Sequence, residues 1–150
     1  MVRKRDLPRK DILADSLNVR LERTFPADVA HIESVVRAIM KAISDLQCGG
    51  NREFEIELSL REALANAILH GCKGDPNKEV AVSVACAETL GVLLVVRDPG
   101  EGFDPMQIPN PVMGRNVYSD HGRGIFLINQ LMDEVRFEKG GTEIHMLKRH

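Results

Sequence analysis

The sequence predicts an α+β fold, a two-layer sandwich in which helices cover one face of a mixed, mostly antiparallel sheet. Two observations support this prediction. Helical patterns and strand pairs are interleaved along the chain without a regular βαβα alternation. The chain has 150 residues, of which 43% are hydrophobic and 28% charged, and this is enough for one hydrophobic core.

The first half of the chain predicts one strand and two helices. Residues 18–25 alternate between apolar and polar side chains, which is typical of a half-buried strand. Apolar residues within 29–46 recur at steps of three and four, and this spacing predicts an amphipathic helix. Gly49 and Gly50 end that helix, and a second one rich in Glu, Leu and Ala follows over 53–69.

The second half predicts two β-hairpins and a third helix. Valine-rich runs at 79–87 and 92–98 form the first hairpin, and 135–138 with 142–148 form the second. Residues 125–132 are apolar enough for a helix that packs on a sheet.

A long loop is predicted over residues 99–124, which are rich in Gly, Pro, Asn and Asp and show little periodicity. Loops of this length inside a compact domain usually serve as lids or binding loops. We expect the lid proper over 105–120, mobile without a ligand and ordered by nucleotide.

The charge distribution excludes two classes of protein. Twenty Lys and Arg against 22 Asp and Glu give a net charge of −2, which argues against a strongly basic nucleic-acid binder and an acidic disordered chain. The first ten residues carry five basic side chains and one acid, or +4, so the remaining 140 carry −6. We expect residues 1–17 to form a flexible basic arm ahead of a domain over 18–150; contact of the arm with a partner or nucleic acid is the alternative.

Cysteine usage and hydropathy indicate a cytoplasmic protein. Cys48, Cys72 and Cys86 are an odd number without paired spacing, so we expect buried thiols in a reducing compartment and no disulfide or CxxC metal site. No apolar run follows the basic N-terminus as in a secretory signal, and none reaches the roughly 18 residues of a membrane span.

Three clusters carry the chemistry. Glu62 and Asn66 are four residues apart, so they share one helical face, and His70 lies one turn further on. Taken alone, such a pair is usually a solvent-facing part of a helix. It gains weight only together with the other two clusters.

The second cluster is Asp98-Pro99-Gly100-Glu101-Gly102, an acid at the end of an apolar strand followed by Gly-x-Gly. The glycines let the backbone approach a ligand, and the carboxylate can accept a hydrogen bond from an amino group. An ordinary turn is the alternative.

The third cluster is Gly122-Arg123-Gly124, directly before the predicted third helix. N–H groups at a helix N-terminus bind phosphate, and arginine adds a planar group that pairs with it. The alternative is a glycine-capped loop with Arg123 in solvent.

In this order, and followed by Gly141-Thr142 in the last hairpin, the clusters resemble the ATP-binding boxes of the GHKL superfamily. The closest resemblance is to the RsbW/SpoIIAB-like anti-sigma factor serine-protein kinases, and it covers roughly residues 18–148. The arm is longer than expected for the family, and His121 stands where a further glycine is common.

The resemblance implies an ATP pocket between the helices and the sheet. Glu62 would be the general base, Asn66 would coordinate Mg²⁺, and Asp98 would receive the adenine amino group. The other residues expected at the nucleotide are His70, Gly100, Gly102, Gly122, Arg123, Gly124 and Thr142.

The function that the resemblance implies is that of an ATP- and Mg²⁺-dependent kinase. It would phosphorylate a serine of a separate anti-anti-sigma (STAS-type) protein and sequester a sigma factor, regulating transcription by partner switching, as in bacterial stress responses. A homodimer is expected, without a membrane or direct nucleic-acid partner.

Two alternatives remain open. One is the catalytic domain of a two-component histidine kinase, which normally comes with a dimerising helix that carries a phosphorylatable histidine. His31 starts the first predicted helix, but that helix belongs to the ATP domain. The other is a non-catalytic anti-sigma or nucleotide-binding switch module.

Overall fold

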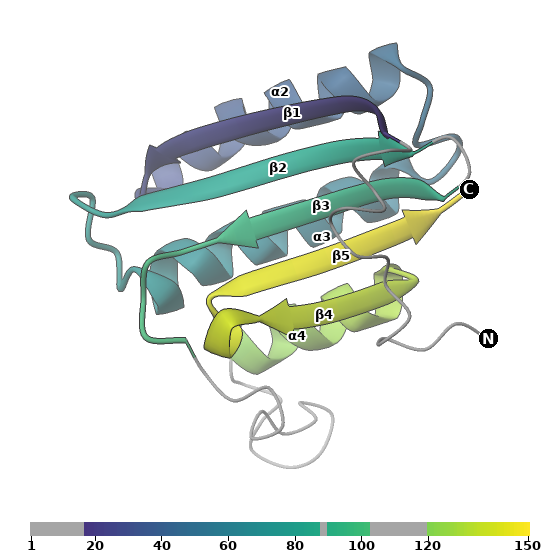
Figure 1. The fold of residues 1–150 in the computed structure, drawn as a ribbon. Coiled ribbons are helices and arrows are strands. Elements are labelled where there is room, and N and C mark those ends of the chain that lie inside the picture. The colour runs from purple at the N-terminus through teal and green to yellow at the C-terminus, as the bar shows by residue number, and fades with distance from the viewer. Residues whose placement is uncertain (1–16, 88–89, 103–119) are drawn as a thin grey trace.

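The described part of the chain folds into two layers, with five strands in one and three helices in the other (Figure 1). The computed structural model describes residues 17–87, 90–102 and 120–150. The strands are β1 (Leu17–Pro26), β2 (Glu79–Ala87), β3 (Gly91–Arg97), β4 (Glu134–Glu138) and β5 (Glu143–Arg149). The helices are α2 (Ile32–Asp45), α3 (Glu53–Asn66) and α4 (Asp120–Leu131). The predicted α+β sandwich with helices on one face is therefore confirmed.

The sheet has the strand order β1-β2-β3-β5-β4, and all four of its pairings are antiparallel. Its strands follow from alternation in the sequence. On β2, Val80, Val82 and Val84 face the helices and are buried, whereas Ala81 and Ser83 face the other side and are half-buried. A one-residue shift in register would turn the valines away from the helices, so this pattern specifies the pairing.

The first helix begins differently from its predicted form. Residues Val29–His31 form a short 3-10 turn, and α2 proper starts at Ile32. Asp28 caps the turn, because its carboxylate accepts a hydrogen bond from the Ala30 amide at 2.9 Å. The predicted apolar face is present and buries Val36, Ile39 and Ile43, among others.

The second helix ends in a π-turn over Ala67–Gly71. The Cys72 amide donates to the Ala67 carbonyl at 2.8 Å, five residues back instead of four. Wider turns of this kind are frequently found at functional sites. The prediction of a plain helix to residue 69 was wrong here, because hydrophobic spacing does not report a change in backbone hydrogen bonding.

The third helix, α4, begins at Asp120, five residues before the predicted start. Gly122, Arg123 and Gly124 therefore lie within its first turns, and the prediction that they precede the helix was wrong. Glycines are poor helix formers, so packing against α3 overrides their propensity here. Most of the predicted lid, residues 103–119, lies outside the described residues.

A buried lysine ties the ends of three elements together. Lys148 of β5 donates from Nζ to the Leu131 carbonyl of α4 at 2.6 Å. The same ammonium pairs with the Glu55 carboxylate of α3 at 2.6 Å. A buried ammonium needs such partners, so Lys148 fixes how α3 and α4 sit on the sheet.

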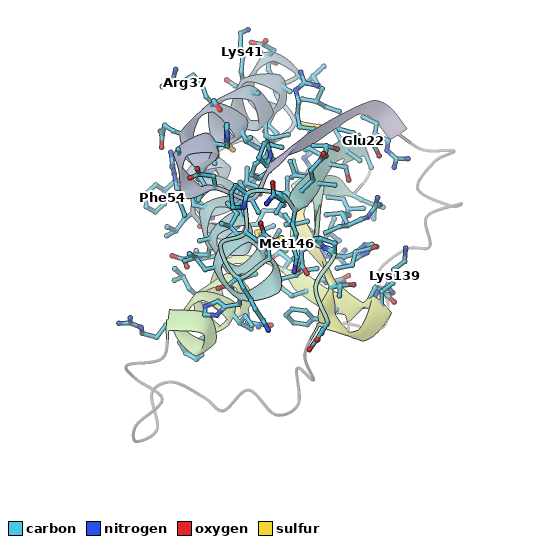
Figure 2. The ribbon with its side chains drawn as sticks, turned by 90° about the vertical axis from the view of Figure 1, so that its left-hand side faces the viewer. Glu22, Arg37, Lys41, Phe54, Lys139 and Met146 are labelled. Carbon is cyan, nitrogen blue, oxygen red and sulfur yellow. A yellow bond between two sulfur atoms is a disulfide. The ribbon has the colours of Figure 1, made fainter. Side chains whose placement is uncertain are left out.

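Apolar side chains fill the space between the layers, as a view along the sheet shows for Met146 (Figure 2). The largest fully buried core residues come from every layer and include Ile39, Leu60, Leu94 and Ile128. Within the described residues, no helix combines the length and the apolar character needed to cross a bilayer.

The cysteines correct one prediction. Cys48, in the turn after α2, and Cys86, on the helix-facing side of β2, are joined by a disulfide with their Cα atoms 6.1 Å apart. The expectation of three free thiols was therefore wrong for this pair. Folding brings together two residues that are 38 positions apart, and spacing alone could not show this. Cys72 is a buried free thiol, as expected.

Candidate functional site

A cleft that is partly open to solvent lies where the end of α3 meets the ends of β3 and β5, and the empty space in and at the mouth of this cleft amounts to about 690 Å³. Its apolar lining consists of Ala63, Ala67, Val96, Ile125, Phe137 and Ile144. Its polar lining consists of Asn66, His70, Lys73, Asp98, Glu101 and Thr142, with the backbone of Gly71, Gly102 and Gly141 between them. An apolar slot with a few polar groups on its wall is the usual form of a small-molecule site.

Asp98 is the acid of this wall. It directly follows β3, and its amide donates to the Thr142 carbonyl at 2.9 Å, which joins the loop to the start of β5. The carboxylate accepts a hydrogen bond from the Gly100 amide at 2.8 Å. Burial raises the pKa of the Asp98 carboxyl, and the Gly100 hydrogen bond opposes this rise. A carboxylate can accept several hydrogen bonds, so Asp98, which lines the cleft, can accept a further one from a ligand there.

The loop after β3 packs closely on the π-turn. A side chain at Gly71 would overlap the Asp98 carboxylate, so only glycine allows the turn and the acid to approach this closely. The π-turn thus brings His70 and Gly71 to the wall of the cleft. The close contact explains why the Glu62–Gly71 segment and the acid after β3 belong to one site.

Glu62 and Asn66 meet α4 at Gly124. A Cβ built on Gly124 would lie 2.9 Å from Glu62 Oε2 and 3.2 Å from Asn66 Nδ2. The two side chains therefore approach the same point of α4, as their four-residue spacing predicts. Asn66 also lines the cleft, and Glu62 lies at its edge without being part of the lining.

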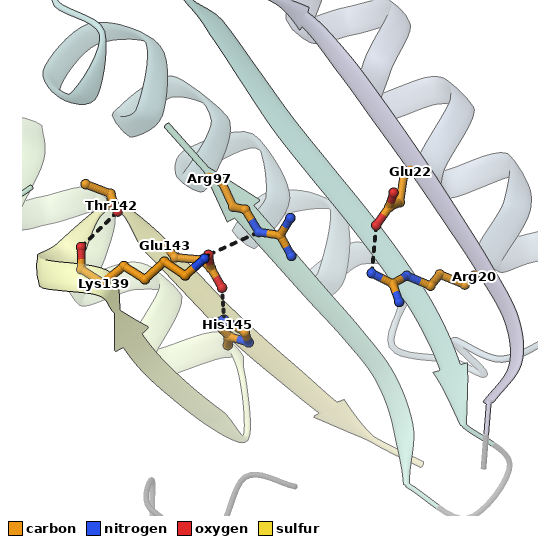
Figure 3. A network of polar contacts seen from close by, with 7 residues as sticks. All are labelled: Arg20, Glu22, Arg97, Lys139, Thr142, Glu143 and His145. Atoms are coloured by element: carbon orange, nitrogen blue, oxygen red, sulfur yellow. Dashed lines mark hydrogen bonds and ion pairs between the residues drawn. The ribbon is translucent and has the colours of Figure 1, made fainter. Parts of the chain in front are cut away.

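Ion pairs between β3 and β5, on the sheet face opposite the helices, hold the strand ends next to the site (Figure 3). Glu143 is buried, forms ion pairs with Arg97 at 3.1 Å and Lys139 at 3.5 Å, and shares a hydrogen bond with His145 at 2.7 Å. Arg97 precedes Asp98 and Glu143 follows Thr142, so the network fixes the strand ends that carry these two site residues. Thr142 itself donates from Oγ1 to the Lys139 carbonyl at 2.9 Å.

The predicted site residues fall into three groups. Asn66, His70, Asp98, Gly102 and Thr142 all line the cleft. Two further residues contact it indirectly: Gly100 through its hydrogen bond to Asp98, and Gly124 through its contact with Glu62 and Asn66. Gly122 is buried and Arg123 exposed, and neither belongs to the described lining.

Sequence reasoning missed several cleft residues. Lys73 also lines the cleft, and its φ of 54° is a left-handed conformation. Local sequence patterns do not predict this conformation, which occurs just after the π-turn. Phe137 and Ile144 stand opposite each other on β4 and β5, and their alternation in the last hairpin could have indicated them. Glu143 is next to Thr142 but outside the cleft lining, and local patterns did not indicate its ion pair with Arg97, since that pair depends on the β3–β5 register.

Fold and cleft together define a two-layer α+β domain with a ligand site between the layers. The histidine kinase-like ATPase domain family matches residues 25–148. The chain belongs to this family of ATPase domains. The family implies nucleotide binding.

Two relatives of the chain have the same name. The chain is 35% identical over 104 residues to the anti-sigma F factor of Bacillus cytotoxicus, covering 63% of this chain and 67% of the relative. It is 33% identical over 106 residues to the anti-sigma F factor of Priestia megaterium, covering 64% and 68%. The resemblance to RsbW/SpoIIAB-like anti-sigma factors is therefore confirmed.

The residues present fit a nucleotide. An apolar slot accepts a flat base, and a half-buried carboxylate in its wall can accept from an exocyclic amino group. For a divalent cation, the described residues contain no cluster of three or more His, Cys, Asp or Glu side chains. Asn66 offers one neutral oxygen ligand, which suits a cation whose other ligands are phosphate oxygens and water.

Proposed function

We propose that this protein is an ATP- and Mg²⁺-dependent protein-serine kinase that also acts as an anti-sigma factor. In this proposal it phosphorylates a serine of an anti-anti-sigma (STAS-type) protein and holds a sigma factor in the alternate state of a partner switch. The relatives named anti-sigma F factor support the sigma-binding half. We further propose a cytoplasmic homodimer that works in a bacterial stress response.

The juxtaposition of Glu62 and Asn66 carries the kinase half of the proposal. A carboxylate and a neutral amide lie one helical turn apart, both against Gly124, and the amide lines the same cleft as Asp98. Phosphoryl transfer depends mostly on positioning and charge neutralisation, with one base near the attacking hydroxyl.

Each residue then has a distinct task. Asp98 accepts from the adenine amino group and selects the base. Asn66 provides an oxygen ligand without adding a charge that would repel the phosphates. Glu62 takes the proton from the serine hydroxyl. Bound ATP with Mg²⁺ supplies the transferable phosphoryl group and neutralises its charge.

The remaining predicted residues belong to the phosphate side and the rim. His70 and Thr142 line the cleft, whereas Gly122 and Arg123 stand at the start of α4. We propose that they contact the phosphates of bound ATP. Gly100 and Gly102 let the loop after β3 follow the ligand.

Transfer of γ-labelled phosphate from ATP tests the function. The chain is purified together with the proteins that it captures from its native host, and the labelled product is identified by mass spectrometry. Label on a serine of a captured protein supports the proposal. Label on a histidine of this chain would indicate a histidine-kinase domain instead, and nucleotide binding without any transfer would indicate a non-catalytic switch.

A further inference from the structure

An apolar stripe runs along the outer side of α3, the side turned away from the sheet. It consists of Phe54, Leu58, Ala65 and Leu69, and we call these four residues the α3 stripe. They follow one another at steps of four, seven and four, so they lie on one face of the helix and of the π-turn that continues it. The opposite face of α3 buries Ile56 and Leu60 in the core. The helix is therefore apolar on two sides, although the sheet covers only one.

The two ends of the α3 stripe are open to solvent. Phe54 is 75% exposed and Leu69 51%, and the two members between them are half-buried. Within the described residues, Phe54 and Leu69 are two of the four large apolar side chains that stay exposed. Figure 2 shows Phe54 on the helical side of the molecule. Single exposed apolar residues are common, but residues aligned on one face form a continuous surface, and such surfaces mark sites of interaction.

The middle of the stripe is polar and its charges balance. Arg61 lies there and donates two hydrogen bonds to the Glu33 carboxylate of α2, at 2.7 and 3.0 Å, and it pairs with Glu57 at 3.5 Å. The hydrogen bonds and charge of Arg61 lower the pKa of Glu33, and the charge of Arg37 adds to this effect. Two carboxylates and two guanidinium groups leave no net charge, so this surface does not suit a nucleic acid. Charged groups in its centre do not suit burial in a lipid surface either.

The stripe borders Glu62, the residue that we propose as the base. Glu62 comes four residues after Leu58 and three before Ala65, so it is their neighbour on the helix surface. It lies on the α4 side of the stripe, because a Cβ at Gly124 would stand 2.9 Å from its Oε2. A polypeptide that covers the stripe therefore has its own side chains next to Glu62. A second copy of the chain in this position would cover the base and block the proposed transfer, whereas a protein substrate needs to be there.

The length of the stripe fits one partner helix. Phe54 and Leu69 are 15 positions apart, which corresponds to about 22 Å at roughly 1.5 Å per residue. A helix of about four turns spans this distance. Such a helix can bind through apolar side chains at one face, which is a common mode of recognition between proteins.

We propose that the α3 stripe is the docking surface for the protein that carries the acceptor serine. The partner presents an amphipathic helix whose two apolar ends cover Phe54 and Leu69, and whose polar centre lies on Arg61. Docking on this surface brings the serine to Glu62. The inference rests on the proposed kinase function and adds to it the surface that recognises the protein substrate.

Steady-state kinetics test the docking surface, with ATP and the protein whose serine takes up the label as substrates. In the double variant Phe54→Ser, Leu69→Ser, we expect the KM for the serine protein to rise about tenfold or more, because truncating apolar anchors at an interface commonly has this effect. The kcat and the Kd for ATP should stay close to the wild-type values, since neither residue lines the cleft.

The matched double variant Phe54→Met, Leu69→Met keeps the stripe apolar and should keep the KM close to that of the wild type. An unchanged KM in the serine variant would overturn the docking surface and leave the kinase function intact. A wild-type chain that labels no serine protein would overturn both. A fall in kcat or in ATP affinity without a change in KM would place the two residues in the nucleotide site and also overturn the proposal.

Photo-crosslinking identifies what covers the stripe. The ¹⁵N-labelled full chain with Phe54→p-benzoylphenylalanine is mixed with unlabelled full chain, the serine protein and ATP, and is then irradiated. We expect crosslinks to one helix of the serine protein. Glu22→p-benzoylphenylalanine, on β1 in the other layer, is the control and should give none (Figure 2). Links from position 54 to the unlabelled chain would assign the stripe to a contact between copies and overturn the proposal, as would links to the serine protein no stronger than those from position 22.

Discussion

Gly124 of α4 lies directly against the Glu62 carboxylate of α3, so close that a Cβ at position 124 would stand 2.9 Å from Glu62 Oε2. Alanine is a better helix former than glycine by about 1 kcal/mol, and the crowded atom is the movable end of a side chain. We therefore expect Gly124→Ala to change the free energy of unfolding by no more than about 1 kcal/mol.

The same substitution should impair catalysis, because it displaces Glu62, the residue that we propose as the base. We expect a loss of phosphotransfer of about tenfold or more, since misplacement by a fraction of an ångström is costly in a reacting geometry. Gln130→Ala, on an exposed position of the same helix, is the control. Wild-type transfer by Gly124→Ala would argue that Glu62 is not positioned by this contact.

Asp98 should determine nucleotide affinity. Asp98→Asn keeps the size of the side chain and removes its charge, which typically costs about 1.5–3 kcal/mol, or roughly one to two decades in Kd. Glu101→Gln, at an exposed position on the same cleft, should have a much smaller effect. Calorimetric titration with ATP measures both, and an unchanged Kd for Asp98→Asn would remove it from the binding site.

His145 should make stability depend on pH. Burial lowers the pKa of His145 from 6.5, and its hydrogen bond to Glu143 opposes this shift. The unfolded chain therefore takes up the proton first as the pH falls. Stability is full above pH 6.5, and it declines from there toward the lowered pKa of the folded state.

Urea unfolding of the wild type and His145→Gln between pH 8 and 5 checks this dependence, since the variant lacks the titrating group. The variant should lose less stability on acidification than the wild type. Parallel curves for the two proteins would show that His145 does not carry the effect.

The disulfide between Cys48 and Cys86 should stabilise the oxidised protein. It closes a loop with a sequence separation of 38. In the chain-entropy description, a loop of this length corresponds to about 4 kcal/mol at 25 °C. Guanidinium unfolding with and without a reductant measures the difference, and Cys86→Ala should behave as the reduced protein does under both conditions. Equal midpoints for oxidised and reduced wild type would contradict the prediction.

The predictable part of the fold was the part that local spacing encodes. Apolar residues at steps of three and four around Ile39 predicted α2, and the alternation of apolar and polar residues predicted β2. Each of these periods matches only one backbone geometry. The start of α4 could not be predicted, since glycines oppose helix formation locally. It depends on the contact of Gly124 with α3, which exists only after folding.

The candidate site was predictable where its residues are near one another in sequence. Glu62 and Asn66 share a helical face by spacing alone. Two features depend on the register between distant segments: the pairing of Cys48 with Cys86, and the burial of Glu143. Local patterns in the sequence do not show this register.

The comparison of Glu62→Gln with Asn66→Ala tests the proposed division of labour most directly. Each variant is titrated with ATP in the presence and absence of Mg²⁺, and its transfer of γ-labelled phosphate to the captured serine protein is measured. Glu62→Gln should retain ATP affinity and lose transfer by about 10²–10⁴-fold, the usual contribution of a general base. Asn66→Ala should lose Mg²⁺-dependent affinity and transfer together. Wild-type transfer by Glu62→Gln, or a loss of ATP affinity as large as that of Asn66→Ala, would contradict the assignment of Glu62 as the base.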